Sequence, residues 1–284
     1  MGTDEIQMEY GTRNRTIQLW EPDIVEAEWV GQKEVHRLLC TSFLKKGGRD
    51  RANTPVLVGD PGNGKTTLAT CVAKEFDLPV YTLSCHSSLQ PEDLLVTPII
   101  SSEGKVIYQG SPLVSAIVNG GLCILDEANR MNEKSWGSLA SLLDDRRYVQ
   151  STAAGVTIPA HPEFRLVATM NEDASTYTIP DYIESRLRPI LPVELPSSKE
   201  LIAIVAKNVP FVPDVLIDAI VHYLAEKKKS GALQRYSVRD AIRIARFAEL
   251  LSGQPDFSLA KTVSYFLKVD GADEQQTSIC TGMK

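Results

Sequence analysis

Hydrophobic positions along this chain follow two different periods. Short apolar runs of the kind found in buried strands alternate with segments whose apolar residues recur every three or four positions, as in helices. Strands that alternate with helices usually form a parallel sheet covered by helices on both faces. The pattern therefore predicts a three-layer α/β domain over residues 28–195. Its expected strands are residues 55–58, 79–83, 122–125 and 164–169.

Helical periods and turn residues fill the intervals between these strands. We expect helices from Val35 to about Gly47-Gly48, through Leu68, Val72 and Phe76, from Gln90-Pro91, through residues 112–118 and through residues 136–143. Two further pairs of apolar runs flank short polar segments, which is typical of hairpins. The expected hairpins span residues 96–109 and 148–158.

The strand pattern stops at Pro196. Ser197 to Glu200 form a capping-box sequence, and further helical periods follow through Leu224, Leu250 and Leu267. Residues 196–268 are therefore expected to form a small helical domain. Residues 1–27 form a polar N-terminal arm, either loose or strapped across a neighbouring surface, and residues 269–284 form a polar tail.

Composition excludes several classes of protein. The chain has 284 residues, 43% hydrophobic and 23% charged, with a net charge of −6, so it is expected to be globular and to have no general attraction for nucleic acid or anionic membrane. We see no apolar run long enough to span a bilayer and no leader. Its five cysteines lack C-x-x-C spacing, which favours reduced core thiols in a cytoplasmic protein.

Residues 59–66, Gly-Asp-Pro-Gly-Asn-Gly-Lys-Thr, match the phosphate-binding loop G-x-x-x-x-G-K-[ST]. The loop lies between an apolar strand and a helix, where backbone N–H groups and the helix dipole attract phosphate. Lys65 should reach the β- and γ-phosphates of ATP, and the Thr66 hydroxyl should bind Mg²⁺. A simple glycine turn is the alternative. The nucleotide-binding residues expected here are Gly59, Pro61, Gly62, Asn63, Gly64, Lys65, Thr66 and Thr67.

Asp126 and Glu127 end the apolar strand of residues 122–125. Strand ends of a parallel sheet meet at one edge, so this pair should lie beside the phosphates. Asp126 is the second expected Mg²⁺ ligand and a nucleotide contact, and Glu127 is the expected general base that activates water. The alternative is a solvated strand end.

Three further polar residues could complete the chemistry. Asn171 ends the next strand and could orient the attacking water, although an Asn in this position is more often a turn residue. Arg186 and Arg188 precede the helical domain. Either could form a surface ion pair or direct its guanidinium at the γ-phosphate of a neighbouring subunit.

Together these motifs resemble an AAA+ ATPase, and most of all the MoxR-like group of the dynein-related type. The resemblance covers about residues 28–252 and assigns Asn171 as sensor 1, Arg186 as the arginine finger and Arg239 as sensor 2. It also implies that Val30 and Gly31 contact the nucleotide. The segments that resemble the MoxR-like pattern are Val30-Gly31-Gln32, Gln90–Leu94, Asp126–Arg130 and Tyr177–Pro180.

The resemblance implies a homo-oligomeric ring, usually a hexamer, with ATP at the subunit boundaries and with the small α-helical domain of residues 196–268 as a lid. It also implies that both hairpins face the pore and that a partner with a von Willebrand A domain acts with the ring. One departure affects the site. Residues 184–188 read Glu-Ser-Arg-Leu-Arg where the group tends to show Asp-Arg-Phe, so the choice of Arg186 over Arg188 is open.

Three functions remain compatible with these residues. The first is a MoxR-type motor that remodels or activates a protein client, as a chaperone or in cofactor insertion. The second is a nucleic-acid-associated NTPase, such as a restriction-system motor subunit. The third is a sensor that binds nucleotide without hydrolysis. The acidic net charge and the few basic residues in the hairpins favour the first over the second, and the Asp126-Glu127 pair disfavours the third.

Overall fold

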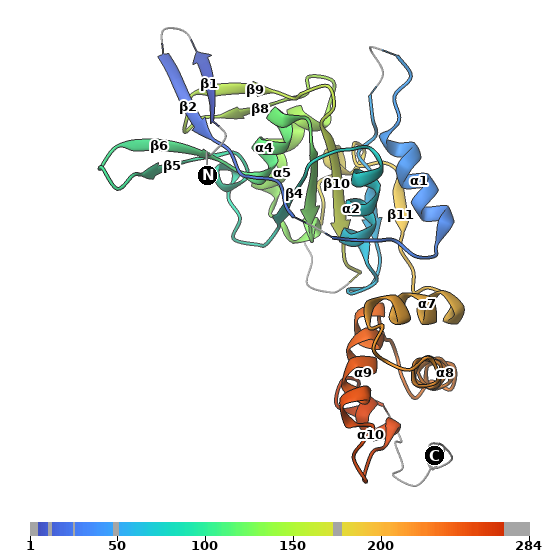
Figure 1. Cartoon of the computed structure of the whole chain (residues 1–284). Coiled ribbons are helices and arrows are strands. Elements are labelled where there is room, and N and C mark those ends of the chain that lie inside the picture. The colour runs from blue at the N-terminus through green and yellow to red at the C-terminus, as the bar shows by residue number, and fades with distance from the viewer. Residues whose placement is uncertain (1–4, 11–12, 25, 48–50, 173–177, 270–284) are drawn as a thin grey trace. The chain divides into compact units, whose positions relative to one another are not determined.

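The computed structural model describes residues 5–10, 13–24, 26–47, 51–172 and 178–269 (Figure 1). The chain divides into two compact units, and each is described by itself. The first unit comprises residues 1–29, 33–59 and 65–193, and the second comprises residues 30–32, 60–64 and 194–284.

A five-stranded parallel sheet forms the centre of the first unit, in the order β11-β3-β10-β7-β4. The four strands expected from the apolar runs are all present. The fifth strand, β11, was not expected, because three residues that include a proline carry no recognisable period. The strands are β3 (Val56–Val58), β4 (Val80–Ser84), β7 (Leu122–Asp126), β10 (Arg165–Met170) and β11 (Ile190–Pro192).

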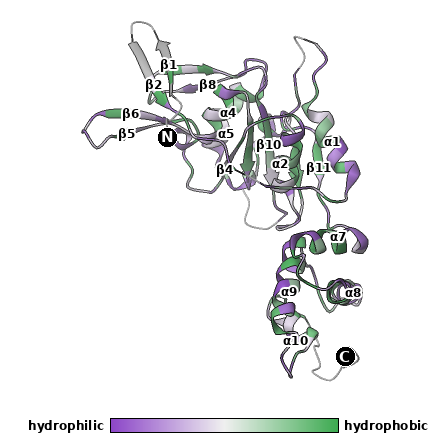
Figure 2. Cartoon of the chain, viewed as in Figure 1, coloured by the Kyte–Doolittle hydropathy of each residue, from purple (hydrophilic) through white to green (hydrophobic). Residues whose placement is uncertain are grey.

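Both faces of this sheet are buried. Leu122 and Ile124 of β7 pack in one apolar cluster, whereas Cys123 and Leu125 pack in another. Successive side chains of a strand point to opposite faces, so a strand covered on both sides must be apolar throughout. Figure 2 shows hydrophobic residues along β4 and β10 in accordance with this arrangement. The predicted three-layer α/β fold is confirmed.

Helix α4 begins and ends at the signals that the sequence predicted. Ser111 caps α4 by accepting from Val114 N, and Gly120 ends that helix in the left-handed conformation. α1 ends at Phe43, earlier than expected, and Gly48 lies outside the described residues. The helices are α1 (Lys33–Phe43), α2 (Lys65–Glu75), α3 (Pro91–Leu94), α4 (Pro112–Asn119), the 3₁₀ turn η1 (Ala128–Arg130), α5 (Glu133–Leu143) and α6 (Asp181–Glu184).

Both expected hairpins are present, and the first belongs to a second sheet of order β1-β2-β6-β5. The N-terminal segment therefore lies across its own unit. Trp20 N donates to Ser115 Oγ at 2.9 Å, and Thr82 N donates to Asp23 Oδ2 at 2.8 Å. The strands are β1 (Glu5–Tyr10), β2 (Arg13–Gln18), β5 (Val96–Ile100), β6 (Val106–Gly110), β8 (Tyr148–Ser151) and β9 (Val156–Pro159).

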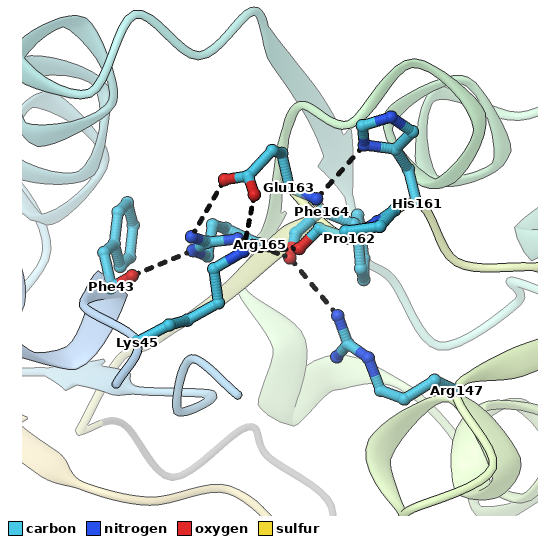
Figure 3. Close-up of polar contacts among 8 residues, drawn as sticks. All are labelled: Phe43, Lys45, Arg147, His161, Pro162, Glu163, Phe164 and Arg165. Atoms are coloured by element: carbon cyan, nitrogen blue, oxygen red, sulfur yellow. Dashed lines mark hydrogen bonds and ion pairs between the residues drawn. The ribbon is translucent and has the colours of Figure 1, made fainter. Parts of the chain in front are cut away.

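A buried arginine joins the end of α1 to the start of β10 (Figure 3). Arg165 is 4% exposed and donates to Phe43 O at 3.1 Å and to Glu163 Oε2 at 3.3 Å. Lys45 donates to the other Glu163 oxygen at 2.5 Å. Burial lowers the pKa of Arg165, and these acceptors offset the cost of burying its charge.

Four helices pack around a separate apolar core in the described part of the second unit. Ser197 and Ser237 each begin a helix with a complete capping box, closed by Glu200 and Asp240. None of the described helices of the chain has both the length and the apolar character needed to cross a bilayer. The helices are α7 (Ser198–Asn208), α8 (Asp214–Lys229), α9 (Val238–Leu251) and α10 (Leu259–Ser264).

Candidate nucleotide-binding site

The ends of β7 and β10 bring a carboxylate and two hydroxyls together. Asp126 Oδ1 accepts from Thr66 Oγ1 at 2.9 Å and from Thr169 Oγ1 at 2.6 Å. Thr66 lies in the first turn of α2, sixty residues from Asp126 in the sequence. Carboxylate and hydroxyl oxygens are hard ligands that suit Mg²⁺. The two residues expected to bind Mg²⁺ therefore lie within one hydrogen bond of each other.

Glu127 is held from three sides. Its backbone has φ 56° and ψ 41°, a left-handed conformation that residues other than glycine rarely adopt. Its N–H donates to Thr169 Oγ1 at 3.0 Å, Asn171 Nδ2 donates to its Oε1 at 3.0 Å, and Arg130 Nε lies 2.7 Å from its Oε2. Strained backbone that the surroundings hold in place is a feature of functional positions. Asn171 thus contacts the residue beside which it was expected to act.

The first unit also contains both ends of the phosphate-binding loop. Lys65 is 7% exposed, and its Nζ donates to Gly59 O at 2.7 Å. Gly59 has φ 154°, and a Cβ there would lie 2.3 Å from Val193 O. A glycine is therefore required at this position. Thr67 follows on the exposed side of α2.

The middle of the loop, residues 60–64, belongs to the second unit. A Cβ on Gly62 would lie 2.6 Å from Ser237 Oγ, and Arg239 N donates to Gly62 O at 3.2 Å. Asn63 is buried, whereas Pro61 is exposed. Residues 60–64 and the start of α9 are therefore in contact within this unit. Both line a cavity of about 610 Å³, and Arg239 and Arg243 form part of its wall.

Val30 to Gln32 also belong to the second unit. Gly31 has φ 78°, and a Cβ there would lie 2.8 Å from Glu200 Oε1. The same oxygen accepts from Gln32 N at 2.7 Å. Hydrogen bonds from Ser197 and Gln32 lower the pKa of Glu200 below its ordinary value. The expected nucleotide contacts Val30 and Gly31 are therefore positioned by the first turn of α7.

Arg186 and Arg188 lie in the segment that follows α6. Arg186 Nη1 donates to Tyr182 O, and Arg188 Nη2 donates to Glu184 Oε1 at 3.2 Å. Arg188 lines a cavity of about 330 Å³ together with Asn171, whereas Arg186 does not. The two candidate fingers thus have different surroundings within one chain.

A match to a known protein family accounts for this arrangement. Residues 55–187 match the family of AAA domains of the dynein-related subfamily. This segment is an AAA+ ATPase domain. The match covers the phosphate-binding loop from Gly59 to Thr66, the Asp126-Glu127 pair and Asn171.

Relatives agree with this assignment. The chain is 36% identical over 122 residues to the denitrification regulatory protein NirQ of Pseudomonas aeruginosa, covering 43% of this chain and 46% of NirQ. It is 35% identical over 118 residues to the protein NorQ of Paracoccus denitrificans, covering 41% of this chain and 43% of NorQ. The chain thus matches under half the length of these curated relatives. The family match and these relatives together confirm the predicted AAA+ and MoxR-like resemblance.

Solved structures support the fold alone. The Holliday junction branch migration motor RuvB of Thermotoga maritima has a TM-score of 0.54 and 19% identity, covering 83% of this chain and 70% of RuvB. A point mutant of the same protein gives a TM-score of 0.56 at 21% identity, with coverage of 84% and 71%. These values confirm the predicted P-loop α/β architecture.

Four residues of the site were not predicted. Thr169 bridges Asp126 and Glu127, Arg130 pairs with Glu127, and Asn129 Nδ2 donates to Asn171 O at 2.8 Å. Glu200 holds Gln32. Asn129 and Arg130 follow the acidic pair directly, so the sequence offered a positional signal for them. A threonine in a strand and a glutamate in a capping box have common structural roles and gave no such signal.

Proposed function

We propose that this chain is an ATP-hydrolysing AAA+ motor. The hydrogen-bonded group of Thr66, Asp126, Glu127 and Asn171 supports the proposal best. Its donor set suits Mg²⁺, which Thr66 and Asp126 would hold. In the loop, a Cβ on Gly59 or Gly62 would collide with a neighbouring oxygen atom, so both positions require glycine. Bound Mg²⁺ would neutralise the charge of the ATP phosphates.

The side chains of this site would neutralise phosphate charge, accept the proton and position the attacking water. Lys65 neutralises phosphate charge once its Nζ leaves Gly59 O. Glu127 accepts a proton from the attacking water, and Asn171 holds that water in line with the phosphate. Both Glu127 oxygens are engaged by Asn171 and Arg130. We therefore propose that Glu127 exchanges one of these partners for water when ATP binds.

We further propose a homo-oligomeric ring, usually hexameric, in which Arg186 acts on the nucleotide of a neighbouring subunit. Within its own chain Arg186 donates to Tyr182 O, whereas the contacts of Glu127 described above are with Thr169, Asn171 and Arg130. Arg239 is the proposed sensor 2, and its backbone N–H donates to Gly62 O of the phosphate-binding loop. A guanidinium supplied by a neighbour makes hydrolysis depend on assembly.

The surface of the β5-β6 hairpin is suited to binding a protein client. The proposed role of this chain toward that client is that of a chaperone or a cofactor-insertion factor. Ile100 is 77% exposed and Val106 is 61% exposed, whereas Lys105 is paired with Glu103 at 2.9 Å. Exposed aliphatic residues bind polypeptide, and phosphate backbones require unpaired cations. A von Willebrand A domain protein is the proposed partner and the cytoplasm the proposed compartment. The name of NirQ as a denitrification regulatory protein is compatible with action on another protein.

A Glu127→Gln substitution tests both parts of this function. The variant should bind ATP normally and lose about 10²- to 10⁴-fold in turnover, because its amide cannot accept the proton from water. Lys65→Ala should fail to bind ATP. ATP binding and phosphate release measured on the full chain distinguish the two variants. Equal turnover by wild type and Glu127→Gln would exclude Glu127 as the base.

The same variant should retain its client. With ATP and Mg²⁺, Glu127→Gln should capture a protein that Lys65→Ala does not, because only the former keeps the ATP-bound state. If DNA instead stimulates wild-type turnover at low salt and the effect fades as salt rises, the nucleic-acid alternative would replace the remodelling role.

A further inference from the structure

Three side chains with metal-binding atoms converge between α1 and α2, away from the nucleotide site. His36 and Cys40 lie one turn apart on α1, and Glu75 is the last residue of α2. Glu75 Oε1 lies 2.7 Å from His36 Nε2, and Glu75 Oε2 lies 3.6 Å from Cys40 Sγ. Cys40 Sγ lies 3.8 Å from His36 Nδ1 and 4.0 Å from Nε2. One nitrogen, one sulfur and one oxygen therefore face a common point.

These distances resemble the edges of a zinc tetrahedron. Bond lengths of about 2.0–2.3 Å imply edges of about 3.6 Å between sulfur and either light atom, and about 3.4 Å between nitrogen and oxygen. Both sulfur edges are already within about half an ångström of this value. His36 Nε2 is hydrogen-bonded to the other carboxylate oxygen of Glu75, Oε1. This bond must break and the carboxylate must rotate before Oε2 and Nε2 can bind the same ion, and one ligand atom of each residue already lies within 4.8 Å of the other two. The Glu75 side chain is 51% exposed and has room for that movement.

We propose that His36, Cys40 and Glu75 bind a zinc ion that joins α1 to α2. Thiolate, imidazole and carboxylate are the three ligand types that zinc uses, and water would take the fourth position. Among the described residues, this is the one group of three or more His, Cys, Asp or Glu side chains whose ligand atoms converge. The His36 side chain is 25% exposed, so an ion can enter from solvent.

This site is separate from the proposed Mg²⁺ site. Glu75 ends the helix that Lys65 and Thr66 begin, and a rise of about 1.5 Å per residue places it roughly 14 Å from Thr66 along the axis. The donor sets also differ, because Thr66 and Asp126 offer oxygen alone, whereas Cys40 offers sulfur. A cysteine-dependent signal therefore reports the α1-α2 site and not the nucleotide site.

Cobalt(II) tests the proposal, since it replaces zinc and its thiolate bond gives an ultraviolet charge-transfer band. The full chain, treated with chelator and then saturated with ADP and Mg²⁺, should develop this band up to one equivalent of cobalt. Visible bands of tetrahedral intensity should accompany it, and zinc should abolish both. Because Cys280 lies outside the described residues, every protein in the experiment carries Cys280→Ser.

Three variants identify the ligands. Cys40→Ser should lose the charge-transfer band, and His36→Gln and Glu75→Gln should weaken zinc binding beyond the roughly 10- to 100-fold typical of changes next to a metal site. The control His222→Gln, in the exposed middle of α8, should bind as wild type. Zinc should also raise the Tm of the wild type relative to chelator, and this rise should be absent in Cys40→Ser.

Two results would overturn the proposal. The first is a folded wild-type chain that shows no charge-transfer band at stoichiometric cobalt. The second is a band that persists in Cys40→Ser, which would assign the thiolate to another cysteine. If Cys40→Ser does not fold, His36→Gln and Glu75→Gln decide the outcome through their zinc affinities. In that case wild-type affinity in both would show that His36 and Glu75 form an ion pair only.

Discussion

Thr169 shows how one hydroxyl can organise the acidic pair. It donates to Asp126 Oδ1 at 2.6 Å and accepts from Glu127 N at 3.0 Å. The first bond orients the expected Mg²⁺ ligand, and the second holds Glu127 in its left-handed conformation. Thr169 is 1% exposed, so water cannot replace either bond.

Thr169→Val should lower ATP turnover by about 10- to 100-fold, the usual effect of losing a partner of a metal ligand. The unpaired Glu127 N–H should also cost about 1–3 kcal/mol of folding free energy. Steady-state phosphate release and thermal melting measure the two effects, and Thr169→Ser should restore both. Thr70→Val is the matched control, because the hydroxyl of buried Thr70 donates to Thr66 O within its own helix. Comparable activity of both valine variants would remove Thr169 from the site.

At the scale of elements, the start of α7 holds the Val30–Gln32 segment. Glu200 accepts from Ser197 N and Oγ and from Gln32 N. A helix N-terminus favours a negative charge, and these donors add to that preference. The pKa of Glu200 is accordingly lowered from its ordinary value of 4.5, with the Ser197 side chain as the largest cause.

Glu200→Gln should destabilise the chain at neutral pH and have little effect in acid. Because the folded-state pKa of Glu200 lies below 4.5, its carboxylate stabilises the fold above that value. The contribution is lost as the pH falls through the folded-state pKa. The Tm difference between wild type and Glu200→Gln should therefore shrink toward zero on acidification, while the control Glu226→Gln, exposed on α8, shows none. A difference independent of pH would mean that the charge of Glu200 is not involved.

At the scale of the whole molecule, the unresolved choice is between Arg186 and Arg188. Arg188 lines a cavity with Asn171 of its own chain, whereas Arg186 contacts Tyr182 O. An arginine finger that acts on the nucleotide of a neighbouring subunit is not expected to lie beside the catalytic residues of its own chain. This expectation favours Arg186 over Arg188. The proposed ring then requires each site to combine Glu127 of one chain with Arg186 of the next.

Mixing Arg186→Ala with Glu127→Gln subunits should restore part of the ATP hydrolysis that each lacks alone. In a randomly mixed ring, about a quarter of the interfaces combine an intact base with an intact finger. Turnover up to about that fraction of wild type is therefore expected, and light scattering should show a larger particle with ATP and Mg²⁺. Arg188→Ala serves as the control. A monomer under these conditions would contradict the ring, and inactivity of Arg188→Ala beside an active Arg186→Ala would reassign the finger.

Predictions from the sequence were accurate where one local segment carries the signal. The phosphate-binding loop is contiguous, and the apolar run of β7 fixes where Asp126 and Glu127 lie at the end of a parallel strand. The capping box at Ser197 likewise appeared at the expected residue. Each of these features is set by residues that lie close together in the sequence, so it can be predicted without knowledge of the tertiary contacts.

Other features arise only from chain segments brought together by folding. β2 pairs with β6 across about ninety residues, which turns a polar arm into part of a sheet. Thr169 resembles any strand threonine until β10 lies beside β7. His36, Cys40 and Glu75 lack metal-binding spacing in the sequence and meet because α1 packs on α2. The sequence by itself determined the α/β fold and the places of the phosphate-binding loop and of Asp126 and Glu127 within it. The tertiary structure decided which side chains meet, because a contact between distant segments produces no periodic pattern in the sequence.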